Sequence, residues 1–171
     1  MHQHFCHLPW AGIDIGNDGK IRPCCKFQED LEKWPQYNVK DGIKNYLSSP
    51  ELNTLKQKVI EGKKPAGCAR CWKDEDANYI SKRLIDYRQW KNEFDDYDFA
   101  SEGFLLVTLP FGNLCNIKCR ICGPKASSSW IKEAKDLFDK QGSVQNWHKD
   151  PEIWKDVLGH IKDCLEFNIT G

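Results

Sequence analysis

The first clear pattern in the chain is an alternation of apolar and polar positions from Trp10 to Arg22. The stretch WAGIDIGNDGKIR has Asn-Asp-Gly at its centre, and Asp-Gly between alternating apolar residues is a strong signal for a β-hairpin. We therefore expect two short strands that are joined at Asn17–Gly19. The two neighbouring cysteines Cys24 and Cys25 follow at the exit of the second strand.

Other segments have the period of a helix. One begins after Ser49-Pro50, a capping serine followed by a proline suited to the first turn, and Gly62 ends it. A second is expected from about Trp72 to Trp90, and its expected apolar contacts are Tyr79, Leu84 and Tyr87. Two more are expected within KASSSWIKEAKDLFDKQG, residues 125–142, and from Asp150-Pro151 to about Ile161.

Two continuous apolar runs, FLLVTLP at 104–110 and LEFNIT at 165–170, predict buried strands. The order of strand, loop, helices and strand is typical of the opening of a parallel α/β sheet with a right-handed crossover. Two strands cannot bury both faces of such a sheet. Because the sequence stops at Gly171, directly after the second run, we expect it to be the front part of a longer protein.

Charge gives no sign of a nucleic-acid or membrane partner. Lys plus Arg and Asp plus Glu both number 25, so no net field would attract a polyanion, and neither partner is expected. No stretch approaches the roughly 18 apolar residues of a membrane helix, and the start lacks an export signal. We expect a soluble, cytoplasmic protein. The acidic segment EFDDYDFASE, residues 93–102, is expected to be a solvated linker.

The nine cysteines carry the chemistry. Without an export signal the thiols should stay reduced, and reduced, clustered thiols usually hold metal. Cys164 stands apart, and we expect it to be a small buried residue. The other eight are Cys6, the pairs Cys24 with Cys25 and Cys68 with Cys71, and the group Cys115, Cys119 and Cys122.

Cys115, Cys119 and Cys122, hereafter the triplet, lie on one short loop after the apolar run 104–110. A structural zinc site needs four protein ligands, and neither His148 nor His160 has the local spacing of an obvious fourth. An iron–sulfur cube held by three thiolates instead leaves one iron free for an outside ligand. We therefore favour a cluster, with zinc as the alternative.

The triplet, Cys-x3-Cys-x2-Cys after an apolar strand, resembles the signature of the radical S-adenosylmethionine enzymes. The resemblance implies an α/β fold, the start of a partial (β/α)6 barrel, over residues 103–171. It also implies a [4Fe–4S] cluster on the triplet and S-adenosylmethionine on its fourth iron, with Ile121 beside the adenine. LEFNITG resembles the family's second strand, so Thr170 and Gly171 would begin the loop that holds the amino group. Catalysis would come from the cluster and S-adenosylmethionine, with no catalytic side chain assigned.

The first region is similar to the SPASM and twitch modules that carry auxiliary clusters in such enzymes. The similar residues are Cys6, twelve residues, Gly19, four residues, Cys24, and then Cys68-x2-Cys71. We call Cys6, Cys24, Cys68 and Cys71 the quartet. The resemblance implies a small Cys-rich α+β module over residues 1–92, with an auxiliary [4Fe–4S] cluster on the quartet; zinc remains a serious competitor there. Cys25 is expected to point elsewhere, and His2, His4 and His7 are expected to be exposed or locally bonded.

Together these features predict the front part of a radical S-adenosylmethionine enzyme. Auxiliary modules of this type imply a peptide or protein substrate and an external electron donor such as flavodoxin or ferredoxin. The 171-residue chain itself is expected to be inactive, because most of the barrel would be missing. The alternative is a zinc-stapled binding module without catalytic activity.

Overall fold

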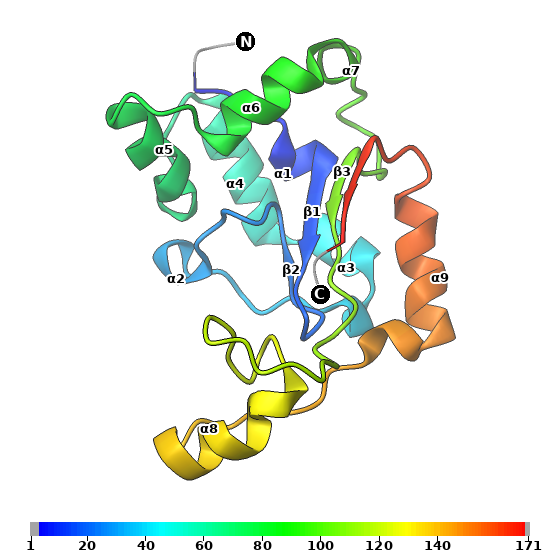
Figure 1. The fold of residues 1–171 in the computed structure, drawn as a ribbon. Coiled ribbons are helices and arrows are strands. Elements are labelled where there is room, and N and C mark those ends of the chain that lie inside the picture. Colours follow the sequence, from blue (N-terminus) through cyan, green and yellow to red (C-terminus); the bar gives the residue numbers. More distant parts are fainter. Residues whose placement is uncertain (1–3, 170–171) are drawn as a thin grey trace.

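The structure is a computed structural model that describes residues 4–169. These residues form a mixed α/β fold around one four-stranded sheet, in the order β2-β1-β3-β4 (Figure 1). The antiparallel pair β1 and β2 comes from the first region, whereas β3 runs parallel to both β1 and β4. The bounds of the strands are β1 Gly12–Ile15, β2 Ile21–Arg22, β3 Leu106–Thr108 and β4 Glu166–Asn168.

The expected hairpin is confirmed. Asp14 pairs with Arg22 across β1 and β2, and the two side chains also form an ion pair. Gly19, at φ 80° in the connecting turn, adopts a left-handed conformation that favours glycine. The hairpin therefore returns the chain so that the residues after β2 lie near those before β1.

The helices of the first region begin with α1 Leu8–Ala11 and end with α7 Lys91–Asp95. The expected helix after Ser49 is confirmed as α4, where the Ser49 hydroxyl accepts a hydrogen bond from the Leu52 N–H at 3.4 Å. The helices between these are α2 Glu29–Glu32, η1 Val39–Asp41, α3 Ile43–Leu47, α4 Pro50–Ile60, η2 Ala66–Cys68, α5 Ala69–Asp76 and α6 Lys82–Gln89.

The single helix expected from Trp72 to Trp90 is wrong. The chain forms α5 and α6 instead, separated by a turn in which Asn78 has a left-handed φ of 61°. Tyr79, expected to be an apolar contact, follows this turn and is 72% exposed. The break reorients α6, which matters below because it brings Arg83 to the quartet.

The second region contains η3 Ser128–Trp130, α8 Ile131–Phe138, η4 Trp147–Lys149 and α9 Pro151–His160. The expected start of α9 is confirmed, since the Asp150 carboxylate accepts a hydrogen bond from the Glu152 N–H at 3.0 Å. The helix expected within 125–142 is shorter than its pattern and ends where Asp139 turns left-handed at φ 50°.

The two apolar runs differ in burial. Around β3, Phe104 and Leu109 are buried as expected. The expectation of a buried strand is wrong for β4, because Phe167 is 40% exposed and Ile169 is 61% exposed. The reason is that β4 lies at the edge of the sheet and pairs with β3 alone among the described strands (Figure 1).

One hydrophobic core joins the two regions. It contains Ile13 of β1 and Leu52 of α4 together with Val107 of β3 and Val157 of α9. The segment 93–102 begins inside α7, and its Phe94 is buried. The expected solvated linker is therefore partly folded, and the expected boundary between residues 92 and 93 falls within a helix.

Cys164 is half-buried beside the main core, where its thiol donates to the Glu166 carbonyl at 3.1 Å. Within residues 4–169, none of the helices has the length and apolar character needed to cross a membrane.

Candidate metal sites

The structure brings the quartet together from three separate segments. Cys6 precedes α1 and Cys24 follows β2, while Cys68 ends η2 and Cys71 lies in α5. All four line one small hollow with mostly apolar walls. The hairpin and α4 produce this arrangement, since each returns the chain toward Cys6.

Burial makes the quartet thiols reluctant to ionise in the metal-free protein. It raises the pKa of the Cys6 thiol to about 12 and raises the pKa values of Cys24 and Cys68 still further. The charges of Cys6, Cys24 and Cys71 add to the raised pKa of Cys68, because like charges repel when they are close. A positive centre bound in the hollow would reverse this preference, since it stabilises thiolates.

Side chains from other elements fix the segment that carries Cys68. The Glu32 carboxylate accepts a hydrogen bond from the Gly67 N–H at 2.7 Å, and the Trp72 indole donates to the Pro65 carbonyl at 3.2 Å. Gly67 lies against the Phe27 ring so closely that an added Cβ would be 2.5 Å from it. The approach of Cys68 to the hollow therefore needs glycine at position 67.

The residues that flank the quartet differ from one another. Cys25 is exposed and does not line the hollow that the quartet shares, in agreement with the expectation. His7, expected to be exposed or locally bonded, is only 5% exposed, so that expectation is wrong. Its ring stacks with Tyr87 at 5.4 Å and Phe94 at 4.6 Å, and burial lowers its pKa to about 4. His4 is half-buried, and His2 lies outside the described residues.

The triplet lies on one loop after β3, toward the α8 end of the molecule and away from α5 and α6 (Figure 1). Cys119 is exposed, whereas Cys115 and Cys122 are half-buried. The sulfur of Cys115 accepts a hydrogen bond from the Ile117 N–H at 3.4 Å. Their spacing places these three thiols on one loop, where Cys119 is exposed, whereas all four quartet cysteines line one hollow.

The segment SSSW, residues 127–130, anchors this loop, a role that the spacing of the cysteines did not predict. The Ser127 hydroxyl donates to the Ile117 carbonyl at 2.9 Å, and Ser129 donates to the Cys115 carbonyl at 2.6 Å. The Trp130 indole donates to the Cys119 carbonyl at 3.0 Å. Three consecutive serines just after a cysteine loop were the available signal, since serine side chains favour local hydrogen bonds to the backbone.

Of the three residues expected near S-adenosylmethionine, the structure describes only Ile121. Ile121 is 97% exposed, so its side chain packs against nothing substantial. Thr170 and Gly171 lie outside the described residues.

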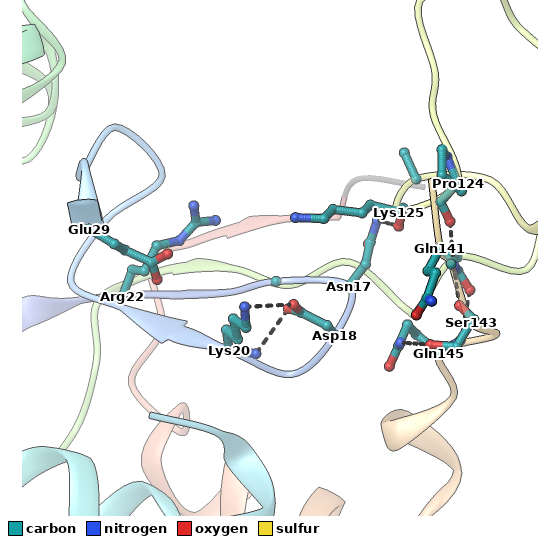
Figure 2. A pocket seen from close by; sticks show the side chains of 14 residues that line it. Asn17, Asp18, Lys20, Arg22, Glu29, Pro124, Lys125, Gln141, Ser143 and Gln145 are labelled. Atoms are coloured by element: carbon teal, nitrogen blue, oxygen red, sulfur yellow. Dashed lines mark hydrogen bonds and ion pairs between the residues drawn. The ribbon is translucent and has the colours of Figure 1, made fainter. Parts of the chain in front are cut away.

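A cleft of about 370 Å³ lies where the hairpin meets the loop that follows the triplet. Figure 2 shows Asn17, whose amide donates to the Lys125 carbonyl at 3.1 Å, and Lys20 beside Asp18. On the side of the cleft formed by the loop after the triplet lies Asn113, which is 2% exposed. The Asn113 side chain donates to the Pro124 and Ser143 carbonyls and accepts from the Gln145 N–H.

The donor chemistry of the quartet suits soft metal centres. Four thiolates bind zinc or an iron–sulfur cluster, whereas Mg²⁺ and Ca²⁺ prefer oxygen ligands. Within residues 4–169, no three His, Cys, Asp or Glu side chains meet closely enough to bind a single metal ion. The quartet is thus arranged around a shared hollow rather than around one point.

Comparison with known proteins agrees with this arrangement. No curated protein and no solved structure matches the chain. Residues 6–72 match the SPASM family, described as an iron–sulfur cluster-binding domain. The match begins at Cys6 and ends one residue after Cys71, so it contains the whole quartet and excludes the triplet. The first region of this protein is thus similar to a SPASM-type iron–sulfur module.

Proposed function

We propose that the first region binds a [4Fe–4S] cluster through the quartet. The observation that carries this proposal is the convergence of four cysteines from three segments on one hollow, within residues that match an iron–sulfur domain family. The apolar wall would shield the cluster from water, and the four thiolates would leave none of its irons open. In this reading the quartet site has an auxiliary role.

We further propose that the triplet binds a second [4Fe–4S] cluster and that the protein is part of a radical S-adenosylmethionine enzyme. Support comes from the spacing of Cys115, Cys119 and Cys122 directly after β3, and from the parallel pairing of β3 with β4. Such pairing is consistent with the start of a (β/α)6 barrel, whose sites lie at the carboxyl ends of the strands. When bound, the cluster would supply one electron for cleaving S-adenosylmethionine.

The residues of this chain would then hold and orient the cofactors. Cys115, Cys119 and Cys122 would ligate three irons, and Ser127, Ser129 and Trp130 would fix the loop by its carbonyls. We propose a peptide or protein as the substrate and a flavodoxin or ferredoxin as the electron donor. This assignment rests on the kinship of the first region to SPASM modules.

Anaerobic reconstitution with iron and sulfide tests both sites in one series. The unmodified chain should bind about eight irons, and Cys68→Ser/Cys71→Ser and Cys119→Ser/Cys122→Ser should each bind about four, because each change removes one four-iron cluster. EPR spectra of the reduced proteins should show the signal of one cluster in each double variant. S-adenosylmethionine should perturb the signal only in the variant that keeps the triplet.

A single tightly bound zinc on the quartet, with no iron uptake there, would contradict the auxiliary-cluster proposal and favour a zinc-stapled binding module. Metal analysis of protein purified without added iron makes that distinction. A triplet signal that does not respond to S-adenosylmethionine would contradict the radical-enzyme proposal and leave the quartet assignment intact.

A further inference from the structure

Arg83 of α6 is a buried cation at the wall of the quartet hollow. It is 8% exposed, although arginine is almost never buried without partners. It also lies eleven residues beyond the end of the family match at residue 72. A feature of this chain outside the matched domain therefore contacts the quartet site.

The guanidinium of Arg83 contacts both the segment before Cys6 and the helix that carries Cys71. One nitrogen, Nη1, donates to the Phe5 carbonyl at 3.1 Å, immediately before Cys6. Nε and Nη2 donate to the Glu75 carboxylate at 2.7 and 2.5 Å, one helical turn beyond Cys71. Arg83 thus reaches a residue 78 positions before it in the sequence and connects Phe5 to Glu75.

Two further contacts restrict this side chain. The guanidinium lies over the Trp72 ring, 4.9 Å from its centroid, and Trp72 follows Cys71 directly. The Ser81 hydroxyl donates to Glu75 at 2.5 Å, which fixes the carboxylate that receives Arg83. Because the bidentate pair and the stacking both require a planar fork, lysine cannot reproduce them.

The cation is also close to two of the thiols. Arg83 attracts the charged forms of Cys6 and Cys71, and its backbone hydrogen-bonds the Cys71 thiol. Acidic groups oppose it, namely Glu75 and Asp74 near Cys71 and Asp86 near Cys6. Arg83 is therefore a buried positive charge that faces a site whose thiolates and cluster would be negative, and the half-buried Lys26 lines the same hollow.

We propose that Arg83 is a positioning residue of the quartet centre, which holds Cys6 and Cys71 at the same hollow and stabilises the negatively charged, metal-loaded site. The metal-loaded part of this inference rests on the proposed function. The other part, the alignment of the two cysteine segments, concerns the metal-free chain and stands independently.

The test compares Arg83→Met and Arg83→Lys with Arg88→Met, a control that removes an exposed arginine of the same helix. The background is Cys119→Ser/Cys122→Ser, so that any cluster signal comes from the quartet. Arg83→Met should lose its cluster to a chelator about 10- to 100-fold faster, as is usual when a residue that orients metal ligands is removed. Arg83→Met should also shift the reduction potential of the cluster to a more negative value, because a nearby positive charge is lost.

Arg83→Lys should separate charge from geometry. It keeps the positive charge but not the fork, so we expect fast cluster loss with a reduction potential close to that of the background protein. Arg83→Met/Glu75→Gln removes the carboxylate that Arg83→Met leaves without its partner. If this double variant regained the cluster stability of the background, the defect would come from the stranded Glu75 and the proposal would be wrong.

Metal-free protein supplies a readout that does not depend on cluster binding. Alkylation of individual cysteines, followed by mass spectrometry, should show faster modification of Cys6 and Cys71 in Arg83→Lys than in Arg88→Met, because Arg83→Lys keeps the positive charge that favours the thiolates and loses only the planar fork that aligns the two segments. Circular dichroism checks that both variants are folded. Glu75→Gln should also speed the alkylation of Cys6 and Cys71, because it weakens the hydrogen bonds that orient the guanidinium of Arg83. Equal alkylation rates in all variants would overturn the proposal, whereas failure of the background protein to take up iron would overturn only the proposed function.

Discussion

The quartet and the triplet differ in how their thiols come close together. The quartet draws on residues that are up to 65 positions apart, from Cys6 to Cys71, and the fold encloses them in a hollow. The triplet lies within one short loop because of its spacing, and Cys119 remains exposed. The quartet thus depends on the folded state of the first region, whereas the triplet depends on one loop.

This difference predicts at which of the two sites metal binding is coupled to folding. A site that closes several segments contributes its binding free energy to folding, because the unfolded chain has no such site. The triplet cysteines lie within eight residues and stay close together even in an unfolded chain. Metal on the quartet should therefore stabilise the fold much more than metal on the triplet.

The largest expected effect is on the metal-loaded protein. Cys68→Ser/Cys71→Ser should lower the Tm by about 10 °C, because the loss of several kcal/mol of binding free energy shifts the transition of a chain of this size by that amount. Cys119→Ser/Cys122→Ser should lower it by no more than about 2 °C. Differential scanning calorimetry under anaerobic conditions measures both values. The contrast should vanish in metal-free protein, and equal Tm losses in the loaded variants would contradict the comparison.

Two glycine substitutions test the same contrast in packing between the quartet and the triplet without removing a cysteine. Gly67→Ala should destabilise the protein by about 1–3 kcal/mol, because the new Cβ would be 2.5 Å from the Phe27 ring in a packed region. Gly123→Ala, in the triplet loop, has no atom within 4 Å of its new Cβ and should change stability by less than about 0.5 kcal/mol. Urea denaturation compares the two, and similar losses would mean that the quartet segment is not the more tightly packed.

The third prediction concerns Asn113, whose side chain fixes the end of the triplet loop through three hydrogen bonds. Asn113→Ala removes hydrogen bonds to Pro124, Ser143 and Gln145, of which the last is 2.7 Å long, and should cost about 1–2 kcal/mol. Limited proteolysis should show faster cleavage in residues 112–124, with unchanged iron on the quartet. Gln141→Ala is the matched control, since Gln141 lines the same cleft but is exposed. Faster cleavage in the control as well would contradict a specific role for Asn113.

The smallest effect concerns Tyr97, which links the two regions through its hydroxyl. The hydroxyl lies 3.1 Å from the Trp10 carbonyl and 2.9 Å from the Gly103 carbonyl, and Tyr97→Phe should cost about 1 kcal/mol at pH 7. Burial raises the pKa of Tyr97 to about 12, above its ordinary value of 10.0. Between these values the unfolded chain releases the proton first, so the stability contributed by this group falls as the pH rises from about 10 to 12.

Urea denaturation at pH 7 and pH 11 measures this change. The advantage of the unmodified protein over Tyr97→Phe should be largest at pH 7 and should shrink at pH 11. Thiols that titrate in the same range are common to both proteins and cancel in the difference. An advantage that grows with pH would show that the sign of the linkage is opposite.

Much of the local structure was predictable from the sequence. Asp18-Gly19 specified the hairpin, Ser49-Pro50 specified the start of α4, and Asp150-Pro151 specified the start of α9. These signals work because a turn or a cap is satisfied by residues within a few positions of each other. The common loop of the triplet belongs to the same class.

Tertiary structure alone decided the remainder. It broke the expected helix at Asn78, buried His7 between Tyr87 and Phe94, and placed Arg83 beside Cys6 and Cys71. It also joined both regions in one sheet and left β4 at the edge of that sheet. The physical reason is that these features depend on contacts between residues many positions apart, whose packing and hydrogen bonds outweigh local preferences of roughly 1 kcal/mol per residue or less.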